Sequence, residues 1–142
     1  MPIQKILVAY DETDASKRAL ERAVELAQAF GAKVSITSVA PVMPASVRGA
    51  GPVDPTDTPQ MRREELKRAH AHLEEQGLDA ELIPATGDPA ETIVSIADDL
   101  GADLVVVGTR EPKLVDRILR QSVSQQVARQ VHRDLLIVHP AH

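Results

Sequence analysis

The chain has 142 residues, a formal net charge of −5 and no cysteine. This length suits one domain with a hydrophobic core, and the lack of cysteine excludes disulfides and thiolate metal sites. The acidic balance argues against nucleic-acid binding, and the near-absence of aromatic residues (one Phe, one Tyr and no Trp) predicts an aliphatic core without stacking platforms for single strands.

The first predicted element is a strand at the N-terminus. Residues 3–10 are mostly aliphatic, as in a buried parallel strand. The chain enters this strand directly and shows no signal-peptide pattern. Elsewhere, no apolar run approaches the roughly 20 residues of a membrane span. We therefore expect a cytoplasmic protein that does not act at a membrane.

Helical and strand patterns alternate along the rest of the chain. Glycine just past a helix end supplies a left-handed cap, and Gly31, Gly77 and Gly101 each separate a helical pattern from an apolar run. The predicted helices span 14–30, with Phe30 on the apolar face, 60–76, 90–99 and 122–131, and the further strands span 34–39, 80–84, 104–107 and 135–138. The alternation predicts an α/β, Rossmann-like fold, a doubly wound five-stranded parallel sheet with about four helices, in a single domain over residues 1–142.

Residues 41–59 interrupt this alternation. They hold half of the chain's 10 prolines and show no strong period. The segment is too long for an ordinary connection. Two interpretations stay open, a flexible, disordered loop and a lid over a ligand.

Candidate binding residues follow from the predicted fold. Ligands of open α/β sheets bind beyond the carboxyl ends of the strands, where this chain has several polar residues and a basic loop that leads into the last helix. The candidates are Asp11, Val39, Gly108, Arg110, Lys113, Ser122 and Val123.

These candidates also have purely structural interpretations. Asp11 is suited to cap the turn into the first helix, and Val39 to pack in the core. Ser122 is suited to be the N-cap of the last helix, with Gln125 as its capping-box partner. The basic residues of the loop at 110–120 would then form a solvated face.

Three stretches of the chain resemble the universal stress protein family. They are ILVAYDETDAS, TGDPAETIVSIADDLGADLVVVGTR and SVSQQVARQVHRDLLIVHP, which together span nearly the whole chain in order. The resemblance implies a parallel sheet in strand order 3-2-1-4-5. It also implies a homodimer formed by antiparallel pairing of the last strand. An exposed aliphatic edge strand has unpaired backbone N–H and C=O groups, which favour pairing with another chain. The dimer residues would be Leu135, Leu136, Ile137 and Val138.

Part of that family binds ATP through glycines that follow the fourth strand. The pattern is Gly, two residues, Gly, nine residues, Gly and then Ser or Thr. On this chain it falls on Gly108, Glu111, Gln121 and Ser122, so two of the three glycines are replaced. A carboxylate at 111 would repel a polyanion, whereas the basic loop and the amides at the helix start favour an anion.

The resemblance leaves three functional hypotheses open. Asp11 matches the acidic residue that contacts adenosine in nucleotide-binding members, and Val39 matches their adenine-facing position. The first hypothesis is a non-enzymatic, stress-linked homodimer that acts through protein partners and holds no ATP tightly. The second is an ATP-binding regulatory dimer that uses the basic loop at 108–122. The third is a site for another small anion in the same cleft.

An enzymatic function finds no support in the sequence. No G-x-S-x-G, Walker or H-E-x-x-H pattern occurs. His70 and His72 lie two residues apart and do not share a helix face, so we expect no metal site. A phosphate-accepting receiver domain has a similar plan but needs an Asp where the third strand ends, and this chain has Pro84, Ala85 and Thr86 there.

Overall fold

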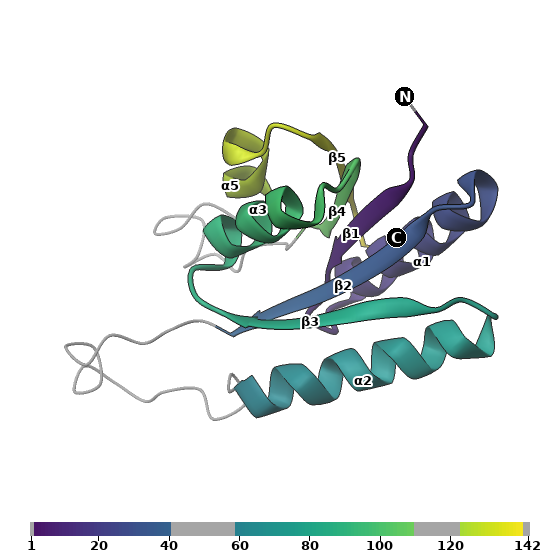
Figure 1. Cartoon of the computed structure of the whole chain (residues 1–142). Helices are drawn as coiled ribbons and strands as arrows, with labels where there is room; N and C mark the ends of the chain where they lie inside the picture. Colours follow the sequence, from purple (N-terminus) through teal and green to yellow (C-terminus); the bar gives the residue numbers. More distant parts are fainter. Residues whose placement is uncertain (1, 41–58, 110–122, 141–142) are drawn as a thin grey trace.

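A five-stranded parallel sheet carries helices on both of its faces (Figure 1). The computed structural model describes residues 2–40, 59–109 and 123–140. The strands are β1 (Lys5–Ala9), β2 (Lys33–Ala40), β3 (Ala80–Thr86), β4 (Leu104–Gly108) and β5 (Asp134–Val138). Their order in the sheet is β3-β2-β1-β4-β5, with every pair parallel, which confirms the predicted fold class and strand order.

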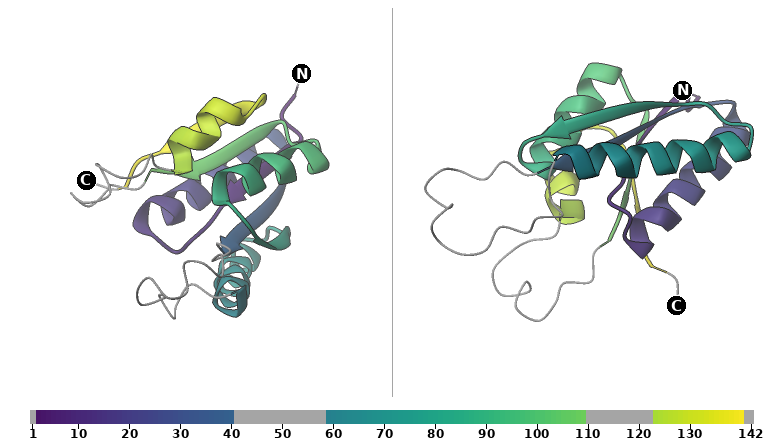
Figure 2. Two further views of the ribbon diagram at one scale, coloured as in Figure 1. Left: turned by 90° about the vertical axis from the view of Figure 1, so that its left-hand side faces the viewer. Right: turned by 90° about the horizontal axis from the view of Figure 1, so that it is seen from below.

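The helices cover the two faces of the sheet in pairs (Figure 2). They are α1 (Asp14–Phe30), α2 (Pro59–Glu75), α3 (Pro89–Leu100) and α5 (Val123–Gln130). Side chains of α1 and α2 share one apolar cluster, and those of α3 and α5 share the other. The ends of all these elements agree with the predicted ones to within one or two residues.

The core is aliphatic apart from Tyr10, as the composition predicts. In the central strand β1, Ile6 and Val8 face α1 and α2, whereas Leu7 faces α3 and α5. All three side chains are at most 1% exposed. Burial on both faces explains why the strand is a continuous apolar run rather than an alternating one.

The glycines that follow three of the helices adopt the predicted left-handed conformation. Gly31 and Gly101 follow α1 and α3 with φ of 66° each, and Gly77 follows α2 with φ of 75°. Glycine adopts this left-handed conformation without the Cβ penalty.

The expectation that Phe30 lies on the buried face of α1 is wrong, because Phe30 is 54% exposed. It is the last residue of α1, and Ala27 is the last residue of that helix to be buried.

Part of the sequence lies outside the structural description. The predicted loop at 41–59 falls there apart from Pro59, which begins α2. None of the helices in the described ranges is long and apolar enough to cross a membrane.

Candidate functional site

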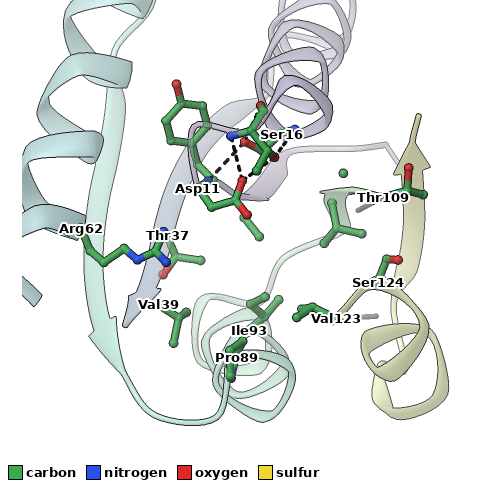
Figure 3. Close-up of a pocket in the computed structure, with 15 residues that line it drawn as sticks. Asp11, Ser16, Thr37, Val39, Arg62, Pro89, Ile93, Thr109, Val123 and Ser124 are labelled. Atoms are coloured by element: carbon green, nitrogen blue, oxygen red, sulfur yellow. Dashed lines mark hydrogen bonds between the residues drawn. The ribbon is translucent and has the colours of Figure 1, made fainter. Parts of the chain in front are cut away.

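A cavity of about 270 Å³ opens at the carboxyl ends of β1, β2 and β4 (Figure 3). Strand order in the sheet reverses between β1 and β4, since β2 lies on one side of β1 and β4 on the other. This reversal is the point at which open α/β sheets bind their ligands. The cavity is close to the lower end of the range of small-molecule sites, about 300–1,000 Å³.

The cavity brings together the candidate residues that the structure describes. Asp11, Val39, Gly108 and Val123 all line it. Their roles in binding a ligand stay predictions. The other candidates, Arg110, Lys113 and Ser122, lie outside the described residues.

The turn between β1 and α1 is held by a dense set of hydrogen bonds (Figure 3). Asp11 Oδ1 accepts hydrogen bonds from the backbone N of Thr13 at 3.1 Å and from its Oγ1 at 2.6 Å. Thr13 Oγ1 in turn accepts from the N of Ser16 at 3.3 Å, so Thr13 is the N-cap of α1. Asp11 therefore orients the capping residue rather than capping the helix itself.

Glu12, next in this turn, connects the cavity rim to α2. Its backbone is left-handed, with φ of 61°, a conformation that costs roughly 1–2 kcal/mol for residues other than glycine. Its carboxylate accepts a hydrogen bond from Arg68 Nε at 2.8 Å and another from Arg68 Nη2. This hydrogen-bonded ion pair holds the pKa of Glu12 below its usual range.

Tyr10 follows β1 directly and also lines the cavity. Its side chain is buried, with a residue exposure of 7%. Burial raises the pKa of Tyr10 to about 12, and the negative charge of Glu12 adds to this effect. The phenol therefore stays protonated to a higher pH than an ordinary tyrosine.

Gly108 ends β4 and packs against the first turn of α1. A Cβ at this position would lie 2.6 Å from the carbonyl carbon of Ala15 and 2.7 Å from the backbone N of Ser16. Both atoms belong to the first turn of α1 and cannot rotate away. Packing alone therefore demands glycine here, whether or not the loop that follows binds a phosphate.

The cavity has an apolar side and a polar side (Figure 3). Val39, Pro89 and Ile93 gather at one side of it, below Thr37. Thr109 and Ser124 lie on the other side, at the end of β4 and the start of α5. Arg62 and Thr37 lie next to Val39, so polar groups flank the apolar side chains at both ends. Apolar side chains with a few polar groups around them are the usual form of a site for a small organic ligand.

Arg62 of α2 also lines the cavity, and sequence reasoning missed it. The sequence pattern predicts an apolar stripe that begins at Met61. In the structure, Leu66, Ala69 and Leu73 are the buried residues of α2. Arg62 precedes Leu66 by four residues, which places it on the same face. A charged residue at the head of a buried stripe is the signal that could have identified it.

The described residues show no grouping suited to a metal ion. They contain no set of three or more His, Cys, Asp or Glu side chains arranged to hold one. His70 instead lies 3.4 Å from Glu74 and 3.5 Å from Asp79. His70 does not line the cavity.

A doubly wound α/β sheet with a cavity at its switch point defines the class of protein, and comparison with known proteins identifies the family. The sequence pattern of the Universal stress protein family matches residues 2–139, so the chain belongs to this family. Universal stress protein YxiE of Bacillus subtilis (strain 168) is 35% identical, over 94% of this chain and 97% of its own. Universal stress protein MJ0531 of Methanocaldococcus jannaschii is 30% identical, over 95% and 81% respectively. A universal stress protein solved in complex with cAMP is 28% identical with a TM-score of 0.76, over 99% of this chain and 100% of that one.

Proposed function

We propose that this protein is a non-catalytic, stress-linked regulatory protein whose cavity binds an adenine nucleoside monophosphate and holds ATP only weakly. The observation that carries the proposal is the cavity at the β1/β4 switch, lined by Asp11, Val39 and Gly108. A relative that is 28% identical over its whole length was solved in complex with cAMP, which carries a single phosphate.

The two sides of the cavity suit the two ends of such a ligand. The apolar side at Val39 and Ile93 suits a purine ring. The polar side holds Thr109, Ser124 and the N-terminal end of α5, where backbone N–H groups and the helix dipole favour an anion. Asp11 lines the same cavity from the β1–α1 turn, and its carboxylate is suited to accept hydrogen bonds from ribose hydroxyls.

The preference for one phosphate over three follows from the sequence after β4. A triphosphate needs more backbone amides at close range than a monophosphate, and glycine permits that approach. Here Glu111 and Gln121 replace two glycines of the family pattern, and Glu111 adds a negative charge. The alternative is an ATP site in which Arg110 and Lys113 compensate for both changes.

We further propose that the chain forms a homodimer paired through β5. The dimer would act on protein partners that bind differently to its nucleotide-bound and nucleotide-free forms. Among the described residues that line the cavity, Asp11 is the one carboxylate that could serve as a general base, and it already holds Thr13. Any hydrolysis of a bound nucleotide would then be incidental to regulation.

Isothermal titration with AMP, cAMP and ATP tests the nucleotide proposal. We expect a monophosphate to bind the native protein at least about ten-fold more tightly than ATP, a difference of about 1.4 kcal/mol. The double variant Glu111→Gly, Gln121→Gly should raise the affinity for ATP while leaving that for AMP within about two-fold, because it removes the negative charge and the side chains that keep the outer phosphates away from the backbone amides.

Two matched variants locate the binding to this cavity. Asp11→Asn removes the carboxylate charge at the cavity and should weaken AMP binding. Asp14→Asn makes the same change at the exposed first residue of α1 and should not. ATP binding as tight as AMP in the native protein would favour the alternative site, and a protein that binds none of the three nucleotides would contradict the proposal.

A further inference from the structure

Arg62 occupies the side of the cavity opposite to α5 (Figure 3). Its guanidinium lies beside Thr37, with Val39 next to it, whereas Val123 and Ser124 of α5 lie across the cavity. The side chain belongs to α2, a helix that contributes none of the candidate residues identified from the sequence.

The guanidinium of Arg62 is held in position by a chain of contacts. Arg62 Nη1 lies 3.1 Å from Glu65 Oε2, and the Oγ of Ser38 donates to the same carboxylate oxygen at 3.2 Å. Ser38 is 1% exposed and fixed within β2. The Arg62 and Glu65 side chains are only 18% and 12% exposed. The pair is therefore anchored to the sheet, unlike a surface ion pair whose side chains move freely.

The pairing with Glu65 determines what Arg62 can offer a ligand. The carboxylate offsets the positive charge, so Arg62 is poorly suited to attract a phosphate from this position. The guanidinium still offers hydrogen-bond donors in fixed directions. It carries five N–H donors in a rigid planar fork and can bind a carboxylate and a ligand at the same time. A donor of this kind matches an acceptor atom at the edge of a heterocyclic base.

We propose that Arg62 is the base-reading residue of the nucleotide cavity. A purine ring resting on Val39 and Ile93 presents its edge toward Arg62, which donates a hydrogen bond to a ring nitrogen of adenine. Glu65 and Ser38 act as positioning residues that fix the guanidinium. This assignment rests on the proposed function, since it requires a nucleotide whose base lies on the apolar side of the cavity.

The test is a titration cycle between protein variants and base analogues. AMP and its 1-deaza, 3-deaza and 7-deaza analogues, each of which replaces one ring nitrogen by C–H, are titrated into the native protein and into Arg62→Ala. We expect Arg62→Ala to weaken AMP binding about 10- to 100-fold, the loss typical of a hydrogen bond to a charged donor. One deaza analogue should show the same loss on the native protein and no further loss on Arg62→Ala.

Arg63→Ala is the matched control, because it removes the same charge from the next residue of α2, which is exposed and does not line the cavity. It should bind AMP as the native protein does. Thermal unfolding checks that each variant folds. If Arg62→Ala does not fold, Arg62→Met keeps the length of the side chain, removes its donors and carries the same comparison.

The possible outcomes separate this inference from the proposed function. If AMP does not bind the native protein, the proposed function fails and the inference falls with it. If AMP binds the native protein and Arg62→Ala equally well, the proposed function stands and the base-reading role is overturned. The base-reading role is also overturned if Arg62→Ala weakens AMP and all three deaza analogues by equal factors, because Arg62 would then act on the phosphate or on the fold.

Discussion

At the scale of single residues, Gly108 joins strand packing to the candidate site. Gly108→Ala should lower the free energy of unfolding by about 1–3 kcal/mol, the usual cost of forcing a methyl group into a packed position. The added carbon would meet backbone atoms of Ala15 and Ser16 at 2.6–2.8 Å, so β4 or α1 must shift. Because α1 begins at the cavity, AMP affinity should fall as well. Urea unfolding and nucleotide titration measure the two effects.

Gly31→Ala is a useful comparison for this substitution. A Cβ at Gly31 meets nothing within 4 Å, and only its positive φ of 66° is unfavourable. This change should lower the free energy of unfolding by about 1–2 kcal/mol and leave AMP affinity unaltered, since Gly31 caps the far end of α1. Equal effects of the two variants on nucleotide affinity would show that β4 does not position the start of α1.

The residue scale also shows the limits of prediction from this sequence. Asp11 could be selected because it follows a buried strand at the edge where ligands bind. The hydrogen bonds of Asp11 could not be predicted from the sequence. Helix-capping residue types occur at four positions of this turn, Asp11, Thr13, Asp14 and Ser16. The choice among them depends on where β1 ends and on the left-handed backbone of Glu12.

At the scale of elements, the contact between Glu12 and Arg68 ties the β1–α1 turn to α2. The ion pair lowers the pKa of Glu12 from its ordinary value of 4.5. Because the folded pKa lies below the unfolded one, the stabilisation is present above pH 4.5 and is lost as the pH falls through the folded pKa. Native protein should therefore be more stable than Glu12→Gln at pH 7, and the difference should shrink as the pH falls toward 3.

Chemical unfolding of both proteins at several pH values measures this difference. Glu25→Gln is the matched control, because Glu25 pairs with Arg22 on the exposed surface of α1 and exposed pairs contribute little to stability. It should differ little from the native protein at any pH. A gap between native protein and Glu12→Gln that stays constant from pH 7 to pH 3 would contradict the assigned role of the carboxylate.

Elements are more predictable than the contacts between them. Short aliphatic runs, glycine after helices and apolar residues at helical spacing are local signals, and they locate the strands and helices closely. Local signals did not predict the cavity position of Arg62 or the exposure of Phe30, because both depend on which helix lies over which strands. That information is long-range, so the local pattern of α2 places the start of its stripe at Met61 rather than at the charged residue beside it.

At the scale of the whole molecule, strand order decides which edges of the sheet remain open. The alternation of helices and strands predicts a parallel sheet, but the order 3-2-1-4-5 comes from family resemblance, since periodicity does not specify which strands pair. In this order β3 and β5 are the edge strands. The β3 edge contains Pro84, which lacks an N–H, and the exposed side chain of Glu81, both of which discourage pairing with another chain.

The β5 edge has no such protection between its ends, and we predict that two copies of the chain pair through it. Leu135, Leu136 and Ile137 are half-buried on this strand, although among the strands that the structure describes β5 pairs only with β4. Leu136→Lys should convert the dimer to a monomer, because it places a charge where a second strand would approach. Light scattering coupled to size-exclusion chromatography reports the mass directly.

Leu82→Lys on β3 provides the control that separates lost pairing from lost stability. Leu82 and Leu136 are both half-buried leucines on edge strands, and both pack against the apolar cluster beneath α1 and α2. Each lysine should therefore destabilise the fold to a similar degree in urea, while only Leu136→Lys changes the mass. A native protein that elutes as a monomer, or a Leu82→Lys variant that dissociates equally, would contradict pairing through β5. A dimer that survives Leu136→Lys would place the contact on another surface.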